Sequence, residues 1–353
     1  MQAAHARRQI PCPPTIVGAA LSPIVPIEMQ TSQFRRENDR LATMVQMLTM
    51  PEADRLALAA EYQARSEAAF APTTKRCLRQ MVASFQAWCR EQGHSDQPPM
   101  SPSVVAAYVD SLSGRIRVST IESRLWAIAE LHKSRFLPSP CQHDLVRLAI
   151  KAVKREHGSA RRQAAPLGKR EIRRALQRLG NTRRDLRDRA LLLVASDTWC
   201  RSAEIVAFRV RDVLPQADGS GLLFIARSKT DPDGRGAYAY LSPQGLAAVR
   251  QWVEVAGLAG GDPLFMSSLA RDPKRPLDPA TLSRIFKERT GRKDVSAHST
   301  RVGGVHDALK LGCDLASIMI AGRWTSAEMP AQYGRMILPA LGAAAKVCAA
   351  VEE

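Results

Sequence analysis

The sequence has few cysteines, and none of them pairs with another at a metal-binding spacing. Its seven cysteines are scattered along 353 residues, and no Cys-x-x-Cys pair occurs. Structural zinc sites and disulfide frameworks are typically marked by closely spaced or regularly repeated cysteines. We therefore expect neither, and we interpret each cysteine as a small apolar residue in a reducing cytoplasm.

Long apolar runs are also lacking. The most apolar part of the N-terminal region, residues 16–27, is interrupted by Pro23 and Pro26, so the N-terminus has no basic head followed by a long apolar run. A secretory signal needs an unbroken apolar stretch, and a membrane helix needs one of about 20 residues. The sequence therefore predicts a cytoplasmic protein that has no membrane partner.

Three common signatures of cofactor chemistry are missing as well. The sequence contains no Walker loop, no cluster of carboxylates and no Cys/His metal spacing. We expect an activity that uses no cofactor and no metal.

Acidic residues are scarce relative to basic ones. There are 51 Lys and Arg but only 34 Asp and Glu, so the formal net charge is +17. Such a surplus repels itself in a folded chain unless a polyanion shares the surface, and nucleic acid is the usual polyanion. A membrane surface or simple solubility explains the charge less well.

The positive charge is concentrated between residues 151 and 181. This stretch holds two glutamates, Glu156 and Glu171. Its cations are Lys151, Lys154, Arg155, Arg161, Arg162, Lys169, Arg170, Arg173, Arg174 and Arg178. One interpretation is a solvated basic helix and linker; the other is a surface that contacts DNA phosphates and loses affinity with salt.

The pattern of apolar residues divides the chain into four parts. Residues 1–50 predict a loosely ordered arm, with a short helix near Phe34–Met50. Residues 51–157 predict an all-α domain, because apolar positions recur every three or four residues. Residues 158–166 form a basic linker, and residues 167–353 a second domain. The helices expected in the first domain are Asp54–Ala69, Pro72–Gln92, Ser103–Ser113, Ser119–Arg135 and Gln142–Glu156, with Ser101 and the Ser119/Glu122 pair as caps.

The second domain predicts helices around one β-hairpin. The strands are Leu222–Ala226 and Ala237–Leu241, joined by a turn at Asp231–Gly236. Helices are expected at Pro243–Val255, Asp278–Thr290, Ser299–Leu311, Asp314–Ala321 and Ser326–Met336, and an Ala-rich helix spans residues 339–351. The fold class is therefore mainly α, with an α+β C-terminal domain.

Three short motifs carry polar chemistry, and each is weak alone. Arg201 and Glu204 are three residues apart after the apolar run 190–195, a spacing that usually gives a surface ion pair. His298 and Arg301 share a helix start, where N–H donors and the helix dipole favour an anion. Trp324 precedes Tyr333 by nine residues, and either side chain alone is usually a packing residue.

The order of these motifs is far more specific. Arg, then Lys on a hairpin, then His-x-x-Arg, Trp and Tyr resembles the tyrosine recombinase (phage integrase) family, and most of all its Cre-like branch. The resemblance covers roughly residue 72 to the C-terminus, and the helical first half resembles the branch's core-binding, SAM-like domain. It implies a C-shaped clamp around DNA, and a nucleoid-associated protein encoded by a bacterium, phage or plasmid.

The resemblance also implies the site. Tyr333 is the nucleophile that forms a 3′-phosphotyrosine, Arg201 and Arg301 clamp the scissile phosphate, and His298 assists proton transfer. Trp324 donates its indole N–H and packs the pocket. Glu204 does not contact the phosphate but orients the residues that do. Lys229 is the general acid, although Arg227 and Arg235 on the same hairpin compete for this assignment. Where many relatives have glycine, this chain has Trp199, which we expect to pack under the site.

The implied activity is site-specific recombination of double-stranded DNA carrying an inverted repeat. The implied assembly on DNA is a homotetramer, and the free protein is a monomer or weak oligomer. The C-terminal helix docks on the neighbouring protomer and so joins the tetramer; the alternative is that it docks on its own domain. Base contacts are expected from helices around Arg115–Arg135 and Asp278–Arg292. The alternatives are a type IB topoisomerase or telomere resolvase, and a non-catalytic DNA-binding relative.

Overall fold

The computed structural model describes residues 49–160, 163–231, 233–267 and 275–352. The chain separates into two compact units, one up to Arg161 and one from Arg162. Each unit has its own apolar core. The predicted arm and its helix near Phe34–Met50 fall almost wholly outside the described residues.

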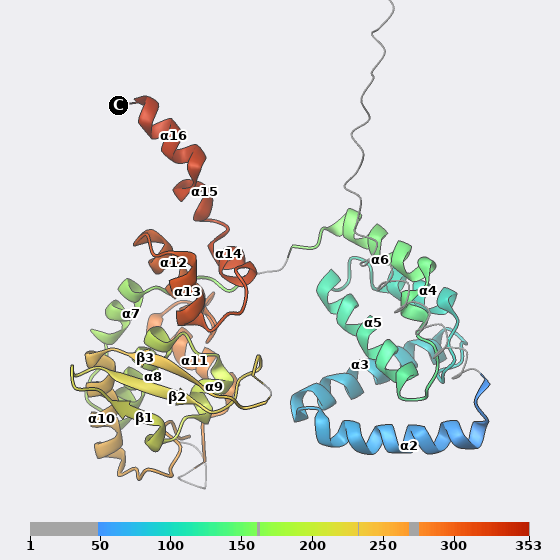
Figure 1. Ribbon diagram of the computed structural model, residues 1–353, viewed down its shortest axis with the longest axis horizontal. Helices are drawn as coiled ribbons and strands as arrows, with labels where there is room; N and C mark the ends of the chain where they lie inside the picture. Colours follow the sequence, from blue (N-terminus) through green and yellow to red (C-terminus); the bar gives the residue numbers. More distant parts are fainter. Residues whose placement is uncertain (1–48, 161–162, 232, 268–274, 353) are drawn as a thin grey trace, which may run out of the picture. The chain divides into compact units, whose positions relative to one another are not determined.

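The described part of the first unit is entirely helical, as predicted (Figure 1). Its elements are α2 (Glu52–Ala69), α3 (Pro72–Glu91), α4 (Pro102–Leu112), α5 (Val118–Lys133), the 3₁₀ turn η1 (Pro140–Gln142) and α6 (Asp144–His157). The apolar stripes of α3, α4 and α5 meet in a core around Phe85, Tyr108 and Ile128. Burying these stripes stabilises helices that would be marginal alone.

One of the two predicted helix caps in this unit is wrong. Ser101 caps α4 as expected, because its Oγ accepts from the backbone N–H of Val104 at 3.3 Å. The pair Ser119 and Glu122 does not cap α5, which begins one residue earlier at Val118. Val118 is buried in the core, so packing sets the start of the helix, and Glu122 instead pairs with Lys154 at 2.7 Å.

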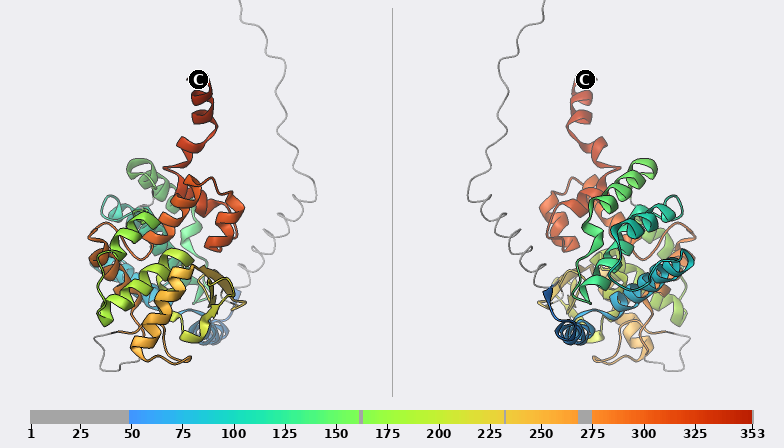
Figure 2. Two further views of the ribbon diagram at one scale, coloured as in Figure 1. Left: turned by 90° about the vertical axis from the view of Figure 1, so that its left-hand side faces the viewer. Right: turned by 90° about the vertical axis from the view of Figure 1, so that its right-hand side faces the viewer.

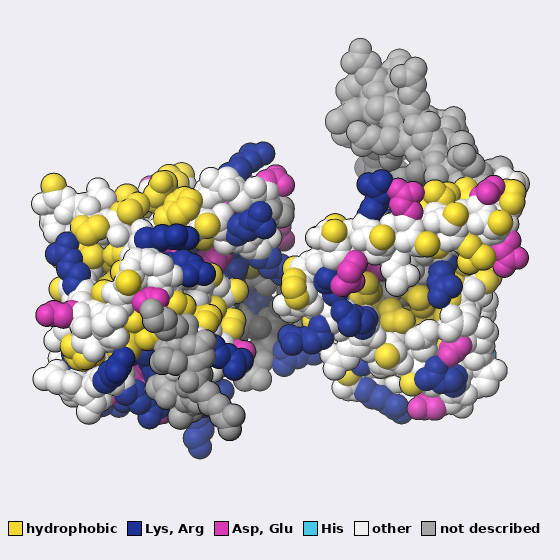
Figure 3. All heavy atoms as spheres, turned by 90° about the horizontal axis from the view of Figure 1, so that it is seen from below, with side chains coloured by type: hydrophobic (Ala, Val, Ile, Leu, Met, Phe, Trp, Pro, Cys, Tyr) yellow, Lys and Arg dark blue, Asp and Glu magenta, His cyan; other side chains and the backbone are white. Residues whose placement is uncertain are grey.

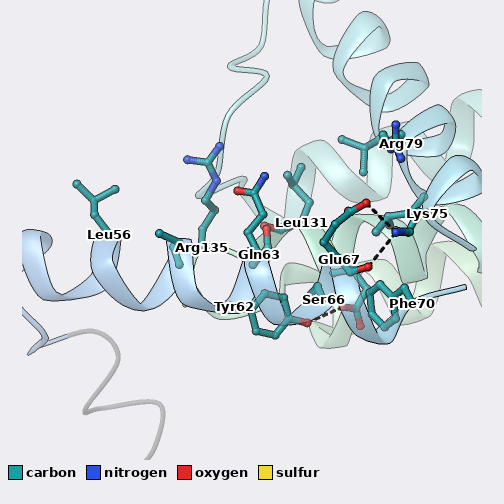
Figure 4. A pocket seen from close by; sticks show the side chains of 16 residues that line it. Leu56, Tyr62, Gln63, Ser66, Glu67, Phe70, Lys75, Arg79, Leu131 and Arg135 are labelled. Carbon is teal, nitrogen blue, oxygen red and sulfur yellow. Dashed lines mark hydrogen bonds and ion pairs between the residues drawn. The ribbon is translucent and has the colours of Figure 1, made fainter. Parts of the chain in front are cut away.

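Helix α2 contributes no buried side chain to the first unit. It borders a hollow of about 530 Å³ that is also lined by α3 and α5 (Figure 4). Tyr62 ties it down, because its hydroxyl donates to Glu130 at 3.1 Å and its ring meets Phe136 edge-on. Helix α2 is therefore held to the rest of the first unit by a hydrogen bond and an edge-on aromatic contact, rather than by packing in the core.

The second unit places helices around a small sheet. Its elements are α7 (Lys169–Leu176), α8 (Arg183–Thr198), α9 (Ser202–Ala207), η2 (Val210–Asp212), β1 (Val213–Pro215), β2 (Gly221–Ile225), β3 (Ala237–Leu241), α10 (Pro243–Ala256), α11 (Pro279–Thr290), α12 (Ser299–Lys310), α13 (Leu315–Gly322), α14 (Glu328–Gly334), α15 (Leu338–Leu341) and α16 (Ala343–Glu352). Helix α8 is buried along most of its length and forms the centre of the core.

The sheet has three antiparallel strands in the order β1-β2-β3, one more than the predicted hairpin. Leu222 faces Tyr240 on β3 and Leu214 on β1. Strand β1 has only three residues, two of them exposed, so it lacks the alternating pattern that predicts a strand. The inner faces of β2 and β3 bury Leu223, Ile225 and Leu241 in the core.

The C-terminal helix expected at residues 339–351 is divided in the structure. It consists of α15 and α16, separated by Gly342, whose backbone is extended. Both helices extend away from the rest of the second unit in every view (Figures 1 and 2). Val347 and Val351 on α16 are exposed, so α16 buries little against its own unit.

Two sequence expectations concern what the described residues contain. The six cysteines among them are all unpaired thiols. None of the described helices combines the length and apolar character that crossing a bilayer requires.

Candidate functional site

Arg201 and Glu204 form an ion pair at the start of α9. Arg201 is the N-cap residue rather than a helical one, so its pair with Glu204 three residues later is a capping arrangement. Glu204 Oε2 accepts from the Arg201 backbone N–H at 2.9 Å, and Oε1 accepts from Nη1 at 2.8 Å. One carboxylate therefore fixes both the backbone and the guanidinium of Arg201.

His298 and Arg301 lie at the start of α12. His298 is the N-cap residue, and Arg301 is buried in the first turn. Arg301 Nη1 donates to the Trp199 carbonyl at 2.6 Å, and Nη2 donates to the Gly322 carbonyl. Its guanidinium also lies over the Trp324 ring, 4.3 Å from the centroid. Carbonyls and a π face hold this cation, which forms no ion pair with a carboxylate of the described residues.

Tyr333 lies on α14 with its hydroxyl 2.7 Å from Nε2 of His298. The ring is 7% exposed and meets the rings of His298 and Trp324 edge-on. The structure thus brings together six predicted residues: Arg201, Glu204, His298, Arg301, Trp324 and Tyr333.

Burial and the arginines set the protonation states in this pocket. Burial, followed by the charges of Arg301 and Arg201, lowers the pKa of His298, so its imidazole is neutral near pH 7. Burial raises the pKa of Tyr333 and outweighs the opposing effect of the same two arginines. The cations alone therefore do not produce a phenolate, and a base must take the proton. Neutral His298 is placed to accept it.

Burial disfavours the charged forms of both Glu204 and Arg301, but the neighbouring arginines favour the charge of Glu204 and oppose that of Arg301. Burial works to raise the pKa of Glu204, but hydrogen bonds from Arg201 and the charges of Arg323 and Arg201 lower it overall. Burial and the neighbouring Arg201 and Arg323 lower the pKa of Arg301. An added anion would relieve this repulsion, so the pocket favours a phosphate.

Lys229 is not brought into this cluster. It is exposed on the segment between β2 and β3, next to the bridge that pairs Ser228 with Asp231. Among the described residues its side chain forms no hydrogen bond and no ion pair. The competing Arg227 and Arg235 lie on the same segment and are also exposed.

Arg323 is a site residue that the sequence did not single out. Its Nη2 donates to Glu204 Oε2 at 3.0 Å, on the carboxylate that also holds Arg201. The motif Gly322-Arg323-Trp324 drew attention only to its tryptophan. The only sequence signal that could have identified Arg323 was its position directly before Trp324, a predicted site residue.

Trp199 packs where the sequence predicted. It ends α8 in a left-handed conformation, and its ring lies 6.4 Å from that of Trp324. Gly304 on α12 makes room for it, since a Cβ there would lie 2.2 Å from the Trp199 ring. The bulky residue thus supports the floor of the pocket.

The carbonyl of Tyr333 accepts two hydrogen bonds from other segments. Gln163 Nε2 donates from the segment before α7, and His306 Nε2 donates from α12, both at 2.9 Å. Sequence reasoning missed both residues, because a backbone acceptor leaves no motif. These contacts hold the turn of α14 that carries the phenol.

We predict that Gln163→Ala slows DNA cleavage about 10-fold, because a small displacement of a nucleophile costs reactive geometry. His306 still holds the carbonyl, so the loss is partial. The rate of covalent complex formation on a nicked duplex measures it, with Gln177→Ala at the exposed end of α7 as the control. A wild-type rate for Gln163→Ala would contradict this role.

The second unit exposes many basic side chains. Figure 3 shows Lys and Arg side chains spread over the second unit, with fewer Asp and Glu among them. On α7, Ile172 and Ala175 face the core while Arg173 and Arg174 are exposed. Among the described residues, no group of three or more His, Cys, Asp or Glu could hold a metal ion.

Comparisons with known proteins agree on one family. The phage integrase family matches residues 166–336, which contain every predicted site residue. Recombinase Cre of Escherichia phage P1 is 28% identical over 304 residues, covering 79% of this chain and 88% of Cre. The integrase/recombinase XerD homolog of Selenomonas ruminantium is 27% identical over 301 residues, covering 79% and 86%.

Solved structures show the same fold. The Tn1549 transposon integrase in complex with transposon right end DNA matches with a TM-score of 0.58 at 12% identity, over 78% of this chain and 93% of the integrase. The XerH site-specific recombinase bound to palindromic difH substrate matches with a TM-score of 0.52 at 16% identity, over 70% and 72%. The chain belongs to the phage integrase family and is a site-specific recombinase of the tyrosine type.

Proposed function

We propose that this recombinase cleaves and rejoins duplex DNA through Tyr333, and that the residues gathered around Tyr333 perform the chemistry. The observation that carries the proposal is the 2.7 Å contact between the Tyr333 hydroxyl and neutral His298. It lies in a pocket that holds the guanidinium groups of Arg201, Arg301 and Arg323, and among the described residues one carboxylate, Glu204, pairs with Arg201 and Arg323. The pocket has an activated nucleophile and a deficit of negative charge.

In the proposed reaction the Tyr333 oxygen attacks the scissile phosphorus and its proton passes to Nε2 of His298. Charge grows on the phosphoryl oxygens, and Arg201 and Arg301 stabilise it with N–H donors that are already in place. The bond to the 5′ oxygen breaks as the 3′-phosphotyrosine forms. Trp324 keeps Arg301 in position through its ring and excludes water.

The departing 5′ oxygen needs a proton, and we assign its donation to Lys229. This lysine is exposed on the segment between β2 and β3. The proposal requires that it reach the oxygen when DNA lies on the site. Rejoining reverses these steps on a new 5′ hydroxyl. It needs no ATP, because the phosphotyrosine linkage replaces one phosphodiester with another.

The proposed target is double-stranded DNA with an inverted repeat, held by both units as a clamp. The basic residues between 151 and 181 are proposed to contact its phosphates, since Arg173 and Arg174 are exposed there. Binding by such contacts weakens steeply as salt is raised. The proposed cleaving assembly is a homotetramer.

Helices α15 and α16 are proposed to join its protomers. Deleting the residues after Pro339 removes nearly all of an element that makes few contacts with its own unit. We predict that the shortened chain binds a single half-site with unchanged affinity but recombines at least ~10²-fold more slowly, because linked sites gain that much from multivalency. Gel-shift and plasmid recombination assays measure the two properties. Normal recombination by the shortened chain would exclude this role.

Paired target sites distinguish a recombinase from a topoisomerase with the same chemistry. The test uses supercoiled plasmids carrying no, one or two copies of the inverted repeat that flanks the gene. The proposal predicts exchange only with two copies. Relaxation of the plasmid without any copy would favour a type IB topoisomerase, and no covalent product on any plasmid would favour a non-catalytic relative.

A further inference from the structure

Arg323 reaches from the end of α13 to the segment that carries Arg201. Its side chain is 12% exposed. Nη1 donates to the Thr198 carbonyl at 3.0 Å, and Nη2 contacts Cys200 Sγ at 3.4 Å and Glu204 Oε2 at 3.0 Å. All three partners lie within residues 198–204, so the guanidinium of Arg323, which comes from the end of α13, holds the turn between α8 and α9.

Glu204 is shared between two arginines. Its Oε1 accepts from Arg201 Nη1, and its Oε2 accepts from both the Arg201 backbone and Arg323. The carboxylate is 3% exposed, so water cannot replace a lost partner. With Arg323 present, each oxygen receives a guanidinium N–H, and the plane of the carboxylate is fixed.

The backbone of Arg323 is unfavourable for a residue with a side chain. It has φ 55° and ψ 47°, the left-handed region in which glycine is favoured. Its Nε is buried without a hydrogen-bond partner among the described residues. A residue retained only for stability would avoid both features, so the contacts of its guanidinium must account for its presence.

The left-handed turn also lets three consecutive residues serve the pocket. The Gly322 carbonyl accepts from Arg301, and a Cβ at Gly322 would lie 1.8 Å from the Trp324 ring. Trp324 then lies against Arg301 and Tyr333. Arg323, which lies between Gly322 and Trp324, contacts Glu204 instead.

We infer that Arg323 is a positioning residue for phosphoryl transfer: it holds Glu204 and the Thr198–Arg201 turn, and through them it orients the guanidinium of Arg201 toward the scissile phosphate. This inference rests on the proposed function. Arg323 contacts residues that hold Arg201, not the reacting atoms.

The test compares wild type, Arg323→Gly and Arg323→Lys on a nicked duplex carrying the flanking inverted repeat. Glycine fits the left-handed backbone, so this variant keeps its fold while losing the guanidinium. Lysine keeps the charge but cannot contact Thr198 and Glu204 with two prongs. Covalent complex formation, DNA affinity and melting temperature are measured for each, and Arg250→Gly, at an exposed position on α10, is the control for removal of an arginine.

We expect Arg323→Gly to cleave roughly 10²-fold more slowly, the scale for misplaced catalytic groups, with DNA affinity close to wild type. The melting temperature should fall only slightly, because relief of the left-handed backbone strain offsets much of the stability lost with the contacts to Thr198 and Glu204. Guanidinium chloride at a non-denaturing concentration should restore part of the rate, whereas sodium chloride of equal ionic strength should not. Without the Arg323 charge the pKa of Glu204 rises, so the acid limb of the cleavage profile should move to higher pH. The cleavage rate of Arg323→Lys should lie between those of wild type and Arg323→Gly.

Three results would overturn the inference. One is wild-type cleavage by Arg323→Gly. The second is a slow rate that follows a lower melting temperature and recovers on cooling, because the role would then be stability alone. The third is a loss confined to DNA affinity. If wild type and Tyr333→Phe are equally inactive, the proposed function fails first, and the inference fails with it.

Discussion

Replacing Tyr333 by Phe should abolish covalent attachment to DNA and leave DNA binding intact. The substitution removes one oxygen and keeps the ring, which is 7% exposed and packs edge-on against His298 and Trp324. The lost contact is the 2.7 Å bond to His298. We expect the cleavage rate to fall by on the order of 10⁴-fold or more, the scale for removal of a catalytic nucleophile. Denaturing gels of reactions on a nicked duplex measure the trapped complex.

The matched control is Tyr238→Phe. Tyr238 also carries a hydroxyl in the second unit, but it lies on β3 and is 59% exposed. It should be trapped at the wild-type rate. Equal trapping by Tyr333→Phe and wild type would show that another group attacks the DNA.

Arg301→Lys should impair both cleavage and stability. Arg301 is 1% exposed, donates to the carbonyls of Trp199 and Gly322, and lies over Trp324. A single ammonium cannot bridge both carbonyls or present a planar face to the ring. We expect cleavage to fall by about 10²–10³-fold, as for loss of an oriented transition-state donor. Stranding one buried carbonyl should lower the free energy of unfolding by about 1–3 kcal/mol.

Arg201→Lys separates these two effects. The Arg201 side chain is 22% exposed, and a lysine ammonium at this position can still pair with Glu204 Oε1 while Oε2 keeps its bond from Arg323. It should lose cleavage on a similar scale with little change in the urea midpoint. If Arg301→Lys behaves like Arg201→Lys in stability, the buried carbonyl contacts do not hold the helix start as described.

The parts of the site that could be predicted from sequence are those that carry a local signal. The start of α12 follows from a polar residue before an apolar helical run, and it places His298 beside Arg301. The hairpin of β2 and β3 follows from two strand-forming runs around a turn. The function came from the order of the motifs, since each motif alone is common.

The parts that could not be predicted depend on contacts between distant segments. Arg323 meets Glu204 from 119 residues away, and Gln163 meets Tyr333 from 170 residues away. Neither contact leaves a periodic pattern. The split at Gly342 was missed because an Ala-rich run predicts a continuous helix, although one extended glycine divides it. The residue roles and the exact domain limits remain predictions.

The most direct test of the central claim is the identity of the residue joined to DNA. Wild type is trapped on the nicked duplex, digested with protease and nuclease, and the nucleotide-bearing peptide is sequenced by mass spectrometry. The account predicts a 3′-phosphodiester on Tyr333, in the peptide that begins at Trp324 when the protease cleaves after Arg323. A nucleotide on any other residue, or attachment through a 5′ phosphate, would contradict it.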